Sequence, residues 1–314
     1  MSRNAFKELR VQLRTMRWLG VLRFSINFEK SLVREDAFEQ RCSWLYLVAV
    51  LGITCSLIVY SFYFPGHFVI GRHNSTGNCY ALINFRSCCV VTLLVYIQLY
   101  MRRCRFASLL QSMLRCNRIY ESSRGALSSV FPYFLHLTLF LACMLNYAYG
   151  YWAAGVRLAT IPIYLLQYGF SYLVLGQLVV LFVHCQRILL STLEHYNQLF
   201  LKGLESCKES CVFYEIFRKY NQVMWLSHEE VNQCFGMLLL PITGFILLIT
   251  PAGPFYLVST IFEGRHMQNW RFVFMSSTAV FWSLPWVALL VLAMGMNGIQ
   301  KEVSNLLYPF KRIT

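Results

Sequence analysis

Long apolar runs alternate with polar and basic stretches along the chain. A helix of about 20 apolar residues crosses the hydrocarbon core of a bilayer, and six runs of roughly that length are present. They cover residues 43–64, 83–101, 130–152, 159–183, 235–258 and 272–296. Arg86 is the charged residue within these runs, and we place it at the outer end of the second helix. The pattern predicts an all-α fold, a polytopic membrane helical bundle with six transmembrane helices.

The apolar runs and the stretches between them predict five segments. They are a cytoplasmic N-terminal segment (1–42), four helices with short external loops (43–183), a cytoplasmic helical extension of helices four and five (184–234), helices five and six (235–296), and a cytoplasmic lead-in (297–314). Apolar residues in 184–234 recur with helical spacing. We therefore expect the two extensions to pack against each other or against a neighbouring subunit.

The composition excludes a soluble globular protein, because 57% of the residues are hydrophobic and 13% are charged. The net charge of +14 is a topology signal rather than a sign of nucleic-acid binding. Of the lysines and arginines, 23 fall on one side of the expected membrane and five on the other. The more basic side of a membrane protein faces the cytoplasm. The N-terminus is therefore predicted to be cytoplasmic, and the lipid bilayer is the expected surrounding.

Two local features bear on this topology. The sequon Asn74-Ser75-Thr76 falls in the predicted first external loop, so Asn74 is a candidate glycosylation site. The stretch "FKELRVQLRTMRWLGVLRF" mixes basic and apolar residues. It fits a helix lying along the inner membrane surface and equally a segment packed in the cytoplasm.

Catalytic and metal-binding signatures are missing from the sequence. It contains no phosphate-binding loop, zinc-protease, serine-hydrolase or kinase motif. The polar group Ser227-His228-Glu229-Glu230 fits a solvated helix face. Cys207 and Cys211 lack two further ligands at a spacing that would suit zinc. We expect no enzyme activity, no cofactor and no metal centre.

Aromatic residues gather in the predicted external half of the spans. An apolar pocket with a few polar groups suits a small organic ligand. The candidate ligand-binding residues are Tyr147, Tyr151, Tyr164, Gln167, Tyr168, Phe255, Tyr256 and Trp270. The alternative for most of them is the belt of tyrosine and tryptophan that lies at headgroup level in membrane proteins. Tyr164 lies deeper than a belt requires.

The pattern resembles the insect chemoreceptor superfamily, and within it the gustatory receptors. The resemblance rests on the cytoplasmic N-terminal stretch "WLGVLRFSINFEK", on the inside N-terminus, on the long extension of helices four and five, and on the polar ending "NGIQKEVSNLL". It implies a seven-helix, ligand-gated cation channel of the plasma membrane of chemosensory neurons. It also implies a homo- or hetero-tetramer of related subunits that senses small-molecule tastants.

Members of that family carry a seventh helix with a Thr-Tyr…Gln-Phe signature, which has no counterpart after Tyr308-Pro309-Phe310. We therefore expect a truncated member that does not conduct by itself and is largely retained in the endoplasmic reticulum. Three other classes stay open at this point. They are an odorant receptor of the same superfamily, a G-protein-coupled receptor and a small-solute transporter.

Overall fold

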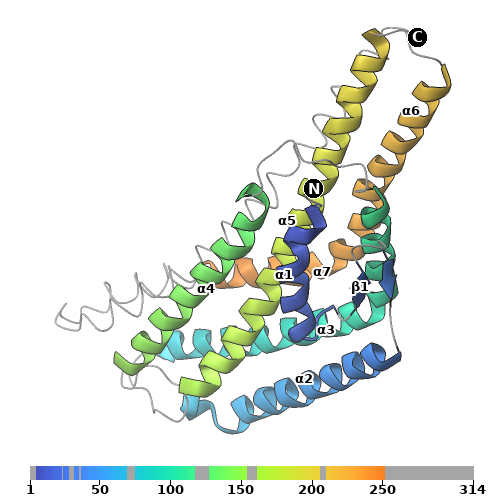
Figure 1. Ribbon diagram of the computed structural model, residues 1–314. Coiled ribbons are helices and arrows are strands. Elements are labelled where there is room, and N and C mark those ends of the chain that lie inside the picture. Colours follow the sequence, from blue (N-terminus) through green and yellow to red (C-terminus); the bar gives the residue numbers. More distant parts are fainter. Residues whose placement is uncertain are drawn as a thin grey trace, which may run out of the picture.

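The computed structural model is a bundle of helices and describes residues 5–22, 24–27, 32–34, 37–68, 75–116, 127–153, 161–205 and 210–251 (Figure 1). The α-helices are α1 (Ala5–Trp18), α2 (Ala37–Tyr63), α3 (Ser75–Cys116), α4 (Leu127–Ala153), α5 (Ile161–Glu205), α6 (Ser210–Trp225) and α7 (Val231–Ile249). A 3-10 turn, η1 (Pro65–Phe68), follows α2, and a π-helical turn, η3 (Leu226–Glu230), joins α6 to α7. The expected all-α membrane bundle is confirmed.

Five of the six predicted spans correspond to described helices. Four stretches are long and apolar enough to cross a membrane: Phe38–Tyr63, Leu82–Leu114, Ile161–Tyr196 and Tyr214–Ile249. The fifth, in α4, has a shorter apolar stretch, Tyr133–Tyr149. The sixth predicted run, 272–296, lies outside the described residues.

Arg86 lies near the Leu82 end of the membrane-capable stretch Leu82–Leu114, the end that is predicted to face outward. Helix α3 itself begins earlier, at Ser75, so Arg86 is held within a regular helix. Its Nε atom donates to the Ser61 hydroxyl at 3.0 Å, and its Nη2 atom donates to the Ser61 carbonyl at 3.0 Å. The guanidinium also lies 3.7 Å from the centre of the Phe62 ring. These contacts with the end of α2 explain how a charged residue can lie within the span.

The N-terminal segment 1–42 contains a short antiparallel β-ladder within the otherwise helical fold. Strand β1 (Ser25–Asn27) pairs with β2 (Leu32–Arg34), with Ile26 opposite Val33. The Val33 amide donates to Gln111 of α3 at 2.7 Å. This small hairpin is therefore fastened to the end of α3.

Helices α5 and α6 reach well past the rest of the bundle (Figure 1). Helix α5 has 45 residues and is about 68 Å long, which is more than twice the thickness of the hydrocarbon core. It packs against α6, and Leu189, Leu193 and Tyr196 of α5 are buried. Tyr214 and Phe217 on α6 face outward instead. The two extensions therefore pack against each other within one chain over the part nearest the membrane. This was the first of the two alternatives for the segment 184–234.

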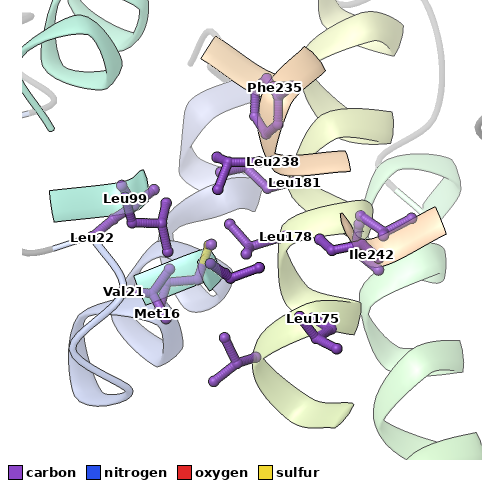
Figure 2. Close-up of a cluster of buried hydrophobic side chains, with 14 of the residues drawn as sticks. Met16, Val21, Leu22, Leu99, Leu175, Leu178, Leu181, Phe235, Leu238 and Ile242 are labelled. Atoms are coloured by element: carbon purple, nitrogen blue, oxygen red, sulfur yellow. The ribbon is translucent and has the colours of Figure 1, made fainter. Parts of the chain in front are cut away.

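The N-terminal helix α1 is part of the core. Figure 2 shows Met16, Val21 and Leu22 from this segment in the same buried cluster as Leu99 of α3, Leu178 of α5 and Leu238 of α7. Polar contacts add to this packing. Gln12 Nε2 donates to the Gln177 carbonyl of α5 at 3.1 Å. Helix α1 is thus held inside the bundle, as the packed alternative expected.

Three further contacts tie the α1 segment to other helices. The Thr15 and Tyr133 hydroxyls lie 2.9 Å apart, which joins α1 to α4. Arg17 forms a salt bridge with Glu39 of α2. The hydroxyl of Tyr96 on α3 donates to the Leu19 carbonyl at 2.6 Å. One short helix therefore contacts four of the longer ones.

Candidate ligand-binding site

A ladder of three tyrosines runs along the first part of α5. Tyr164, Tyr168 and Tyr172 lie on successive helical turns, so their side chains share one face. The ring centres of Tyr164 and Tyr168 are 6.0 Å apart with an angle of 2° between the rings, and those of Tyr168 and Tyr172 are 6.0 Å apart at 28°. All three side chains are buried. We call these three residues the tyrosine ladder.

Aromatic rings from the surrounding elements meet the ladder. Phe85 of α3 lies edge-on to both Tyr164 and Tyr168, with each pair of ring centres 5.8 Å apart. Phe68 of η1 lies 5.4 Å from Tyr164. Aromatic rings favour such tilted and edge-to-face arrangements because the ring edge is positive and the ring face is negative. The end of the ladder nearest η1 is therefore surrounded by matched aromatic contacts.

Two more helices join along the ladder. Tyr147 of α4 has its ring centre 6.1 Å from that of Tyr168. Phe245 of α7 lies 6.0 Å from Tyr172. Rings from α3, α4, α5, α7 and η1 thus form one aromatic cluster.

A row of polar side chains lies beside the ladder, between α5 and α3. Gln167 Nε2 donates to the Ser171 hydroxyl at 3.1 Å, and the Ser171 and Thr92 hydroxyls are 2.7 Å apart. The Thr92 hydroxyl is also 2.8 Å from the Cys88 carbonyl. Gln167, Ser171 and Thr92 are buried. The interior of the bundle thus pairs an aromatic cluster with one hydrogen-bonding row, which are the two kinds of group that contact small organic ligands in proteins.

The burial of these residues separates the site from the aromatic belt. Tyr164, Tyr168 and Tyr172 are between 1% and 3% exposed, whereas Tyr149 is 40% exposed and Trp152 is 63% exposed. Residues of a belt face the lipid headgroups. Tyr149 and Trp152 fit that description, and the tyrosine ladder does not.

The structure brings together four of the eight predicted ligand-binding residues. Tyr164 and Tyr168 stack, Tyr147 contacts Tyr168, and Gln167 begins the adjacent polar row. The backbone of Tyr151 belongs to α4, but its side chain is not described. Phe255, Tyr256, Trp270 and the candidate glycosylation site Asn74 also lie outside the described residues.

Sequence reasoning missed several members of the cluster. Tyr172 follows Tyr168 by one helical turn, so the spacing of the tyrosines on α5 could have indicated it. Phe68, Phe85 and Phe245 come from other elements, and nothing local distinguishes them from core residues. Within the described part of the chain, no three His, Cys, Asp or Glu side chains come together where they could hold a metal ion.

The fold is that of a multi-pass helical membrane protein whose interior carries an aromatic cluster beside a row of hydrogen-bonded polar side chains. The profile of the 7tm chemosensory receptor family matches residues 9–313, and the chain belongs to that family. It is 67% identical over 305 residues to the gustatory and pheromone receptor 39a, isoform D, of Drosophila melanogaster, covering 97% of this chain and 80% of that protein. Isoform A of the same receptor is 34% identical over 299 residues, covering 95% of this chain and 78% of that protein. The chain is a chemoreceptor.

Proposed function

We propose that this chemoreceptor is a gustatory receptor, a subunit of a ligand-gated cation channel that responds to a small organic tastant or pheromone. The names of the two Drosophila relatives support a gustatory rather than an odorant role. The resemblance to insect gustatory receptors supports the channel activity. The observation that carries the proposal is the buried tyrosine ladder, where rings from four helices and η1 meet.

The ligand is mainly apolar and carries one hydrogen-bonding group. The aromatic rings of Tyr147, Tyr164 and Tyr168 supply apolar walls, and Gln167 supplies the polar contact. A buried amide that loses its partner costs about 1–3 kcal/mol, so a ligand that pairs with Gln167 is favoured over one that cannot. This arrangement selects ligands by their shape and by one polar contact.

Ligand binding repacks the cluster, because the ladder residues are already buried. A ligand stabilises the conformation to which it binds more tightly, and it shifts the population towards that conformation. Helix α5 runs unbroken from the ladder to Glu205, and α7 continues through η3 into α6. These long helices connect the site mechanically to the predicted cytoplasmic extension.

The receptor acts in the plasma membrane of chemosensory neurons as a homo- or hetero-tetramer with related subunits. The outward-facing Tyr214 and Phe217 of α6 support contact between subunits, since large exposed apolar side chains mark interaction sites. Packing against a neighbouring subunit was the second of the two alternatives for the helical extension. The pore lies where the subunits meet.

Cation current in response to a ligand tests the proposal. The chain is expressed alone and with related subunits in cells that have no other chemoreceptors, and a panel of sugars, bitter compounds and apolar pheromones is applied. When the chain is expressed with related subunits, we expect an inward current for a subset of the apolar compounds, abolished when sodium is replaced by a large organic cation. Surface-expressed protein with no current for any compound or subunit combination would contradict the channel activity.

A further inference from the structure

Helix α1 has two opposite faces. Gln12, Leu13 and Met16 point into the bundle and are buried. Arg10, Arg14 and Trp18 follow one another at intervals of four residues, so they share one face, and all three are exposed. Trp18 is 76% exposed. We call these three residues the α1 basic face.

The position of α1 along the bundle sets the depth of the α1 basic face relative to the membrane. Trp44 and Tyr63 of α2 are both exposed, and the stretch between them rises about 28 Å, which matches the roughly 30 Å thickness of the hydrocarbon core. Exposed tryptophan and tyrosine favour the two edges of that core. Trp44 therefore marks one edge and Tyr63 the other.

The C-terminal end of α1 lies at the Trp44 edge. Arg17 pairs with Glu39 of α2, which is little more than one helical turn before Trp44. Gly20, just past the end of α1, lies against the Tyr46 ring. Arg41 is exposed at the same level of α2. This edge is the predicted cytoplasmic one.

We propose that the α1 basic face binds the headgroups of anionic phospholipids in the cytoplasmic leaflet. The charge is complementary, since that leaflet carries the negative surface potential that attracts basic residues next to a membrane. The tryptophan fits as well, because its ring lies at headgroup depth. Arg17 is already paired with the buried Glu39, so Arg10 and Arg14 supply the charge.

The contacts of α1 give this binding a consequence for the whole receptor. The α1 segment is tied to α2, α3, α4 and α5 by the polar contacts of Arg17, Leu19, Thr15 and Gln12. A lipid that binds the folded chain and not the unfolded one stabilises the fold. Anionic lipid therefore stabilises the bundle through α1, independently of any ligand.

The test uses the full chain and phosphatidylserine. The apparent dissociation constant for the first bound phosphatidylserine is measured by native mass spectrometry for wild type and for the double variant Arg10→Gln/Arg14→Gln. The control is Arg218→Gln/Lys219→Gln, which removes two charges from α6, away from α1. Size-exclusion profiles establish that all three proteins are folded.

We expect the α1 variant to bind phosphatidylserine at least fivefold more weakly, because one basic residue near the surface contributes about fivefold. The control should bind as wild type does. Phosphatidylserine should also raise the melting temperature of wild type and of the control above its value in phosphatidylcholine, and should raise that of the α1 variant by less. If the α1 variant loses no more affinity than the control, the proposal is wrong, and the face is left to a protein partner.

Discussion

Gly176 on α5 lies so close to His136 on α4 that a Cβ atom on Gly176 would be 2.0 Å from His136 Cε1. Nothing but hydrogen fits between the two, so glycine at this position allows the helices to meet. Small residues play this role in membrane bundles, where close packing replaces the hydrophobic effect as the force between helices. The contact fixes the distance between the helix that carries Tyr147 and the helix that carries the tyrosine ladder.

Gly176→Ala is expected to destabilise the bundle. Overpacking a core costs about 1–3 kcal/mol, so the melting temperature in detergent should fall, as measured by fluorescence-detected size exclusion. Gly244→Ala on α7 is the matched control, since no atom beyond its chain neighbours and its own helix backbone lies within 4 Å of the Cβ position there. It should leave the melting temperature unchanged or raise it, because alanine favours a helix over glycine. Equal effects of the two variants would show that the close contact does not limit the packing.

Gln12→Leu is expected to loosen α1. Its two amide contacts, to the Gln177 carbonyl at 3.1 Å and to His184 Nδ1 at 2.6 Å, would be lost in the buried interior. Each buried group left without a partner costs about 1–3 kcal/mol. Trypsin should then cut faster after the exposed Arg10 and Arg14. The neighbouring Val11→Leu change, on an exposed position, should leave the cutting rate as in wild type.

Removal of Arg17 and removal of Glu39 are expected to lower the stability of the fold by different amounts. Glu39 is buried, with 5% of its side chain exposed, while 47% of the Arg17 side chain is exposed. Arg17→Gln leaves a buried carboxylate without its counter-charge, whereas Glu39→Gln removes that charge. The Arg17→Gln melting temperature should therefore be the lower of the two, and the double variant should recover part of the loss. A double variant no more stable than Arg17→Gln would contradict this account.

Ligand responses should depend on the tyrosine ladder and not on the aromatic belt. Tyr164→Ala and Tyr168→Ala remove rings from the proposed site, and we expect the concentration for half-maximal current to rise at least tenfold. Tyr149→Ala removes a tyrosine ring from an exposed position on α4, and a receptor with this change should respond as wild type does. Surface expression is measured for each variant. A response that falls only in proportion to surface expression would assign the ladder a purely structural role.

Glycosylation tests the predicted orientation. Asn74 belongs to the sequon that overlaps the start of α3 at Ser75. If this end of the bundle faces outward, glycosidase should increase the gel mobility of the wild-type chain and leave Asn74→Gln unchanged. Identical mobility of the two proteins with and without the enzyme would remove this support for the orientation.

The existence of the described membrane helices could be predicted from the sequence, because a long apolar run without charge has few alternatives in a bilayer. The continuation of α5 beyond its apolar run, to Glu205, could be predicted as well, from the helical spacing of apolar residues in 184–234. The continuation of α3 to Cys116 could not, because a helix satisfies its own backbone in water as well as in lipid and needs no apolar run there. Hydropathy marks where the lipid ends and not where the helix ends.

By itself, the sequence determined the class of the fold, the membrane-crossing helices and the predicted sidedness, because each depends on composition summed over a short stretch of chain. Only the tertiary structure decided which face of each helix is interior. Lipid and protein core are both apolar, so lipid-facing and core-facing positions carry the same residue types. Tyr149 and Tyr168 look alike in the sequence, yet one is exposed and the other is buried in the ladder. The aromatic cluster depends on which helices lie side by side, and the neighbours of a helix are set by packing across the whole bundle.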